Sequence, residues 1–264
     1  MDLAKAWVRS LWQSNIWIAC NALALHLLMA ECLALTIHWT TCFVVFGGTC
    51  FVYNALRYRV RNDEEASTHP MVAWQVRHEW FSQNLMILGL GVAAIGAIRL
   101  PLSILMVLFI AVGLVCIYIQ FLRAVGWLKT IIVGVVWSIV LMAPFMLAWS
   151  LDDVLLSAIM ALFIIGLTLP FEIHDQNFDR MAHPTMKTVV HRLGIRTTIR
   201  LSISCFVVVG LLSIYLGIVS GVIISCLCTV FVLRCHERTP EFYYYFLLDG
   251  MMVAWLMIEW ALPY

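Results

Sequence analysis

The chain has 264 residues, of which 63% are hydrophobic and 12% are charged, and its mean hydropathy is +0.96. Soluble globular proteins carry about twice that share of charged residues, so this composition excludes an ordinary soluble domain. The net charge is only +1, and the basic residues are spread over many loops, so the sequence gives no reason to expect a nucleic-acid partner. We interpret the sequence as that of an integral membrane protein.

Apolar stretches follow one another along the whole chain. A helix that crosses about 30 Å of hydrocarbon needs roughly 20 mostly apolar residues. Nine stretches approach this length: 14–35, 38–56, 80–98, 101–121, 130–149, 154–171, 198–218, 220–234 and 243–262. No cleavage site follows the first stretch, so we interpret it as a membrane helix and not as a signal peptide. We expect one domain over residues 1–264, an all-α membrane protein with nine transmembrane helices.

Lysine and arginine are distributed unevenly between the loops. Fifteen of the 16 lie in the N-terminal flank or in the loops after the second, fourth, sixth and eighth stretches, and only Arg99 lies on the other side. Because basic residues of short loops stay on the cytoplasmic side, we expect a cytoplasmic N-terminus, an outer C-terminus and a location in the cell inner membrane. The two longest loops, of about 23 and about 25 residues, follow the second and sixth stretches. We therefore expect the chemistry at the cytoplasmic face.

The loop after the sixth stretch gathers acidic residues at helical spacing. Glu172, Asp175 and Asp179 lie at i, i+3 and i+7, which places three carboxylates on one face of a continuing helix. Such carboxylates repel one another unless a cation lies among them, and Mg²⁺ prefers oxygen ligands of this kind. Lys187, beyond a His-Pro break, is then placed to meet a phosphate. The alternative is that these charges only solvate the end of a helix.

The same loop resembles a known motif. The sequence DQNFDR, followed by Lys-Thr and Leu-Gly, is similar to the second aspartate motif of the UbiA superfamily of intramembrane prenyltransferases, approximately DxxDxxxDRxxGxKTLxxxLG. The matching positions are Glu172, Asp175, Asp179, Arg180, Lys187, Thr188, Leu193 and Gly194. Nine helices, with long cytoplasmic loops after the second and sixth, also resemble this family. The resemblance implies a helical bundle with a cytoplasm-facing central cavity, in which Mg²⁺ helps to bind an isoprenoid diphosphate.

The first motif of that family, NDxxDxxxD, has only a degraded counterpart after the second stretch, in YNALRYRVRNDEEAS. Asn54 fits the leading Asn, Ala55 replaces the first Asp, and Arg57 and Arg61 fall at or beside the later acidic positions. Three accounts stay open. The arginines bind the diphosphate directly, or the acids at 63–65 restore the metal site, or the protein binds an isoprenoid or phosphorylated lipid without transforming it. Both arginines also suit simple anchoring at the cytoplasmic interface.

Other polar residues complete the expected site. In the related proteins a tyrosine and basic residues of the loop after the fourth helix line the diphosphate site, which here points to Tyr118 and Lys129. Asp249 lies within the last stretch, and an ionisable group at membrane depth is either a site residue or a structural hydrogen-bonding group. The histidines lack the dense HxxxH spacing of membrane di-iron enzymes, and the nine cysteines show no CxxC spacing.

We therefore expect a UbiA-like prenyltransferase that uses Mg²⁺ to remove the diphosphate of an isoprenoid and transfers the prenyl group to a lipid or aromatic acceptor. A terpene-cyclase-like enzyme of the same fold and a non-catalytic isoprenoid or phospholipid binder are the alternatives. The expected catalytic residues are Asp175, Asp179 and Asn54; the expected substrate-binding residues are Lys187, Arg180, Arg57, Arg61, Tyr118, Lys129 and Asp249; the expected metal ligands are Glu172, Asp175 and Asp179.

Overall fold

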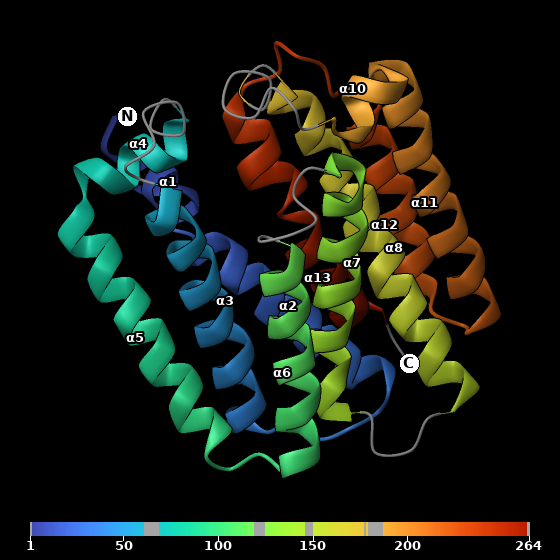
Figure 1. Cartoon of the computed structure of the whole chain (residues 1–264). Coiled ribbons are helices and arrows are strands. Elements are labelled where there is room, and N and C mark those ends of the chain that lie inside the picture. The colour runs from blue at the N-terminus through green and yellow to red at the C-terminus, as the bar shows by residue number, and fades with distance from the viewer. Residues whose placement is uncertain are drawn as a thin grey trace.

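The computed structural model describes residues 2–60, 69–118, 125–145, 150–176, 178 and 187–262, and within these ranges the chain forms helices and no strand (Figure 1). The elements are α1 (Asp2–Gln13), α2 (Ile16–Cys32), α3 (Trp39–Val60), α4 (Pro70–Arg77), α5 (Glu79–Ala97), α6 (Leu102–Ile117), α7 (Gly126–Met142), the 3-10 turn η3 (Ala143–Phe145), α8 (Leu151–His174), α10 (Val189–Leu193), α11 (Ile195–Tyr215), α12 (Val219–Val232), the π-helix η4 (Tyr243–Leu248) and α13 (Met251–Ala261).

Five helical segments of the described chain are long and apolar enough to cross a membrane: α3, α5, α7 with η3, α8 and α11. The bent pair of α1 and α2 raises this number to six if it counts as one span, and α6 and α12 are shorter apolar helices. The prediction of an all-α membrane protein is thus confirmed at this level. Each of the nine predicted stretches coincides with a helix or a helix pair, but length and hydropathy support only five or six of them as spans.

The first predicted span contains a break that the sequence analysis did not anticipate. The axes of residues Trp7–Gln13 and Ile16–Cys32 differ by 71°. Asn15, between them, has a left-handed backbone with φ of 65°, a conformation that asparagine tolerates better than most residues. Its side chain donates to Asn54 Oδ1 of α3 at 3.0 Å. This bond fixes the bend and brings the end of α1 beside α3.

Glycine allows α3 and α5 to pack closely. A Cβ atom at Gly47 would lie 2.6 Å from the backbone oxygen of Gly89, and one at Gly96 would lie 2.4 Å from the oxygen of Thr40. Small residues permit such close approach between membrane helices. The two helices therefore behave as a rigid pair, which together with α4 forms one side of the molecule (Figure 1).

Helix α8 lies at the centre of the bundle. Half of the residues in its 18-residue apolar segment are buried, whereas the buried share is 17% to 39% in the other four candidate spans. It packs between α7 and α11, and Phe163 contacts Trp255 of α13 at 4.7 Å and Phe206 of α11 at 6.0 Å between ring centroids. The C-terminal end of α8 therefore places Glu172 and Asp175 at the wall of a central cavity.

Basic residues gather at one end of the bundle. The N-terminal helix α1 and the short helices α4 and α10 lie at the upper end in Figure 1. Arg57 and Arg59 are in the last turn of α3, Arg77 is in the last turn of α4, and Arg192 is in α10. The helix ends with the most positive charge therefore share one face.

Candidate functional site

A central cavity of about 380 Å³ opens among the helices. Its wall contains residues of α2, α3, α6, α7, α8, η4 and α13, together with the end of α1 and the beginning of α4. Six residues that the sequence analysis selected line it: Arg57, Tyr118, Lys129, Glu172, Asp175 and Asp249. These residues come from five separate segments of the chain. The fold therefore brings most of the described candidates to one space.

The cavity is polar toward one end. Arg57 is in the last turn of α3, Lys129 is in the first turn of α7, and Asp175 directly follows the last residue of α8. The apolar lining from the same helices includes Val52, Val136, Trp137 and Ile164. Those residues lie several positions deeper in the bundle, or roughly 10 Å at 1.5 Å per residue. The cavity therefore suits a ligand with a polar head and an apolar tail.

The guanidinium of Arg57 is held from two sides. Its Nη1 donates to the backbone oxygen of Gln13 at 3.5 Å, and its Nη2 contacts the Met71 sulfur at 3.1 Å. Its charge interacts with those of Asp175 and Asp249, which also line the cavity. Arg57 is therefore a positioned cation among acids and not a freely moving surface anchor.

Asp175 belongs to a cluster with His69 and Tyr245. His69 precedes α4, and its Nδ1 accepts a hydrogen bond from the backbone N–H of Met71 at 3.3 Å. Its Nε2 lies 3.3 Å from the Tyr245 hydroxyl and 3.7 Å from Asp175 Oδ1, and that hydroxyl donates to the same oxygen at 3.2 Å. Because Nδ1 accepts, the proton of a neutral His69 is on Nε2, facing Tyr245 and Asp175. His69 is thus a donor here and not a metal ligand.

The cluster keeps Asp175 ionised. Burial raises the pKa of Asp175, but the interaction with His69, whose Nε2 lies 3.7 Å from Oδ1, and the positive charge of Lys129 outweigh burial, so that the pKa lies below its ordinary value. Within the described residues, the side-chain contacts of Asp175 involve Oδ1, and the residue lines the cavity. Asp175 therefore presents a carboxylate to the cavity that His69 and Tyr245 hold through one oxygen.

Glu172 has different partners from those that its predicted role requires. Its side chain is buried, its Oε1 accepts from the Thr130 hydroxyl, and its Oε2 accepts from the backbone N–H groups of Val189 at 2.8 Å and Val190 at 3.4 Å. Glu172 and Asp175 both line the cavity. However, both oxygens of Glu172 serve to join α7, α8 and α10, and metal binding would require these donors to be displaced.

This arrangement predicts different effects for two substitutions of Glu172. Glu172→Gln keeps an oxygen for the backbone N–H groups, so we expect the free energy of unfolding to change by less than about 1 kcal/mol. Glu172→Leu leaves buried donors unpaired, and we expect a loss of about 2–3 kcal/mol. Thermal unfolding of the purified protein without Mg²⁺ measures both. If Glu172→Gln is as destabilising as Glu172→Leu, the joining role is wrong.

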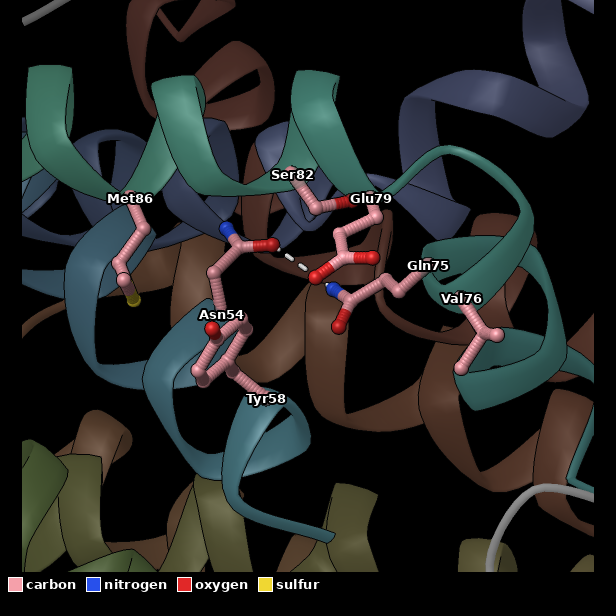
Figure 2. Close-up of a pocket in the computed structure, with 7 residues that line it drawn as sticks. All are labelled: Asn54, Tyr58, Gln75, Val76, Glu79, Ser82 and Met86. Carbon is pink, nitrogen blue, oxygen red and sulfur yellow. Dashed lines mark hydrogen bonds between the residues drawn. The ribbon is translucent and has the colours of Figure 1, made fainter. Parts of the chain in front are cut away.

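Asn54 does not line the central cavity. Its Nδ2 donates to the backbone oxygens of Cys50 at 2.8 Å and Ser14 at 3.2 Å, and its Oδ1 accepts from Asn15 at 3.0 Å and Gln75 at 2.7 Å. It instead borders a smaller pocket between α3, α4 and α5 (Figure 2). The structure therefore does not bring the predicted catalytic Asn54 together with Asp175, and its hydrogen bonds show a structural role.

The remaining candidates are placed as follows. Lys187 is exposed and is not part of the cavity lining, although its backbone packs against α7, where a Cβ at Gly126 would lie 2.7 Å from the Lys187 carbonyl carbon. Asp179, Arg180 and Arg61 lie outside the described residues, as do the acids at 63–65. Within the described part of the chain, no three His, Cys, Asp or Glu side chains are grouped to hold a metal ion.

His69 and Tyr245 were not selected from the sequence. They are 176 residues apart, so only the fold shows that they meet. The His-Pro pair at 69–70 is a helix-start signal that the sequence contains, and Tyr245 lies four residues before Asp249.

No family model, no curated protein and no solved structure matches this chain.

Proposed function

We propose that this chain is a UbiA-like membrane enzyme whose central cavity binds an isoprenoid diphosphate and promotes loss of the diphosphate. The observation that carries the proposal is the position of Arg57, Lys129 and Asp175 at the polar end of an otherwise apolar cavity. A prenyl diphosphate has the matching form, with a strongly anionic head on a hydrocarbon chain. The partial match to the second aspartate motif supports the same assignment.

The proposal includes a nine-span topology. The shorter helices α6 and α12, and the η4 and α13 pair, would cross the membrane beside the five long helices and the bent α1 and α2 pair. The basic end of the bundle would face the cytoplasm by the positive-inside rule, since short loops rich in Lys and Arg stay on that side. The polar end of the cavity, at the ends of α3 and α8, would then open toward the inner leaflet of the inner membrane.

Cations of the chain itself would bind much of the phosphate charge. The planar guanidinium of Arg57 matches two phosphate oxygens, and Lys129 adds a point charge from the opposite wall. This supports the account in which arginine takes over from the degraded first motif. The contacts of Arg57 with Gln13 and Met71 preorganise it, so that little reorganisation is required when the leaving group gains charge.

Asp175 is the described residue that best fits a metal-binding role. Its carboxylate is ionised and faces the cavity, and Asp179 is proposed to share the ion with it. Bound Mg²⁺ would neutralise charge on the departing diphosphate. His69 and Tyr245 would hold Asp175 through Oδ1 and so direct Oδ2 toward the ligand. Glu172 is left out of this proposed metal site because its oxygens are already paired.

The apolar part of the cavity would protect the reactive prenyl group. Trp137 donates to the Tyr53 hydroxyl at 3.2 Å, so both rings are held in place along the wall. Aromatic faces attract positive charge, and an apolar wall excludes water that would otherwise trap an allylic cation. The cation would then react with a lipid or aromatic acceptor, or with a double bond of the same prenyl chain.

The direct test is pyrophosphate release by the purified chain from geranyl, farnesyl and geranylgeranyl diphosphate, with Mg²⁺ and with EDTA. We expect Mg²⁺-dependent release, with an acceptor extract raising the rate or a cyclic product appearing without one. Binding without release would support the non-catalytic alternative. Neither binding nor release of any of the three compounds would contradict the proposed function.

A further inference from the structure

A second pocket of about 150 Å³ lies between α3, α4 and α5 and shares no lining residue with the central cavity. Figure 2 shows the side chains that surround it. They are Asn54 and Tyr58 of α3, Gln75 and Val76 of α4, and Glu79, Ser82 and Met86 of α5. We call this space the side pocket. Nothing in the proposed prenyl chemistry uses it.

The side pocket is rich in hydrogen-bond acceptors. Glu79 has the only charged side chain among the lining residues, and its Oε1 accepts a hydrogen bond from Gln83 Nε2 at 2.9 Å. The amide nitrogen of Gln75 donates to Asn54 Oδ1 at 2.7 Å, which leaves Gln75 Oε1 as the atom of that amide that accepts (Figure 2). The Asn54 nitrogen is directed to the backbone oxygens of Ser14 and Cys50. An anionic ligand would therefore meet repulsion here, whereas a cation with N–H groups would be attracted.

Ser82 provides a second and independent indication of a ligand. Its side chain is 8% exposed, and its hydroxyl oxygen is buried without a hydrogen-bond partner in the structure. Other helical hydroxyls of this protein bond to the carbonyl four residues earlier, as Thr168 does with Ile164 and Ser225 with Gly221. A buried unpaired hydroxyl costs free energy. Ser82 thus borders the side pocket with a polar group that a bound molecule would satisfy.

The side pocket lies beside the ends of two candidate membrane spans. Helix α3 ends at Val60 and α5 begins at Glu79, and both are candidate membrane spans. The lining residues fall within about two turns of these two helix ends or in the connecting helix α4. Next to the pocket, Trp80 is 77% exposed and Phe81 is 44% exposed. Exposed tryptophan of this kind is typical of the membrane interface.

We propose that the side pocket binds a primary ammonium group, supplied by the headgroup of an ethanolamine phospholipid. An ammonium has three N–H donors, and the side pocket offers the Glu79 carboxylate, the Ser82 hydroxyl and Gln75 Oε1 to receive them. A choline headgroup has no N–H donor and is usually bound by several aromatic rings. Here Tyr58 is the only aromatic residue in the lining.

Lipid nanodiscs containing the full chain test this proposal. The three compositions are dioleoylphosphatidylcholine alone, or with an equal share of either dioleoylphosphatidylethanolamine or dioleoylphosphatidylglycerol. The readouts are the thermal-unfolding midpoint and the phospholipid that stays bound in native mass spectrometry. We expect the ethanolamine lipid to raise the midpoint and to be retained preferentially. Equal behaviour in all three compositions would mean that the side pocket holds water only, and would overturn the proposal.

Two variants connect the effect to the side pocket. Ser82→Ala should weaken retention of the ethanolamine lipid about fivefold, and Glu79→Gln about tenfold or more, because a charged hydrogen bond is lost. In pure phosphatidylcholine, Ser82→Ala should unfold at the same or a higher temperature, since it removes an unpaired hydroxyl. Ser225→Ala and Asp152→Asn are the matched controls and should leave lipid retention unchanged.

Two results would contradict the assignment. Unchanged retention of the ethanolamine lipid in both Ser82→Ala and Glu79→Gln would show that the lipid binds elsewhere. Free ethanolamine added to phosphatidylcholine nanodiscs should give no shift at the concentration of the lipid headgroup, and a shift equal to that of the lipid would overturn the lipid source. Because none of these measurements uses a prenyl diphosphate, they can fail or succeed independently of the proposed function.

Discussion

Replacement of Arg57 by Met should weaken binding of a prenyl diphosphate about 100-fold, since loss of one partner from a buried charged contact typically costs 2–5 kcal/mol. Arg57 lies at the polar end of the central cavity, and in the proposed function it binds the phosphate charge. Methionine fills a similar volume, and the hydrogen-bond contacts of Arg57 within the described residues are those with Gln13 and Met71. The variant should therefore fold, which circular dichroism and thermal unfolding would verify.

Arg57→Lys tests the positive charge of residue 57 separately from the planar shape of the guanidinium. It retains the positive charge but not the planar pair of N–H groups, so we expect about a tenfold loss of affinity. Arg99→Met is the matched control, because Arg99 lies at the opposite end of α5 from the cavity's polar end. If Arg57→Met binds prenyl diphosphates as tightly as the Arg99→Met protein does, Arg57 is an interfacial anchor and not a phosphate ligand.

Asp175→Asn should reduce Mg²⁺-dependent pyrophosphate release by about 10²–10³-fold, the range found when one electrostatic group of a catalytic site is removed. In EDTA the same variant should bind the diphosphate more tightly than the original protein. The reason is that Asp175 is ionised and repels an anionic head when no metal lies between them. These opposite signs are specific to a carboxylate that acts through a metal ion.

Asp152→Asn provides the control for Asp175→Asn. Asp152 is exposed in the first turn of α8, at the other end of the same helix, and lies outside the capping box, which Ser150 and Asp153 form. Asp152→Asn should change neither release nor binding. A structural role for Asp175 alone would lower both Mg²⁺-dependent release and metal-free binding, and that result would contradict its assignment.

Much of the central cavity was predictable because charges are rare in this chain. Glu172, Asp175 and Asp249 were selected as acids at the end of an apolar stretch or within one, whereas Arg57 and Lys129 were selected through the motif resemblance, and all five line the cavity. In a membrane protein such groups are costly in lipid, so they turn to the bundle interior. Sequence position was therefore sufficient to identify the acids, and the two cations depended on the resemblance.

The partners of these residues were not predictable. Glu172 is paired with backbone N–H groups 17 and 18 residues later, and a spacing rule on one helix contains no information about that contact. Asn54 matched a motif position, but in the structure its Oδ1 accepts hydrogen bonds from Asn15, at the bend, and from Gln75 of α4. These bonds join separate segments of the chain. The bend itself depends on one residue in a left-handed conformation, which hydropathy does not detect.

The contacts of His69 were also not predictable from the sequence. His69 is the residue before Pro70, the first residue of α4. Its contact with Tyr245 and Asp175 required α4, η4 and the end of α8 to meet, and no local pattern indicated that they would. Pairwise contacts between distant segments were thus the part of the site that needed the fold.

The most direct test of the central claim is calorimetric titration of the purified chain with a non-hydrolysable farnesyl thiodiphosphate, in Mg²⁺ and in EDTA. Wild-type protein, Arg57→Met and Arg99→Met are compared under both conditions. We expect binding that Mg²⁺ strengthens, a loss of about 100-fold in Arg57→Met, and no change in Arg99→Met. Equal affinity in all three proteins, or no binding to the wild-type chain, would contradict the assignment of the cavity as an isoprenoid diphosphate site.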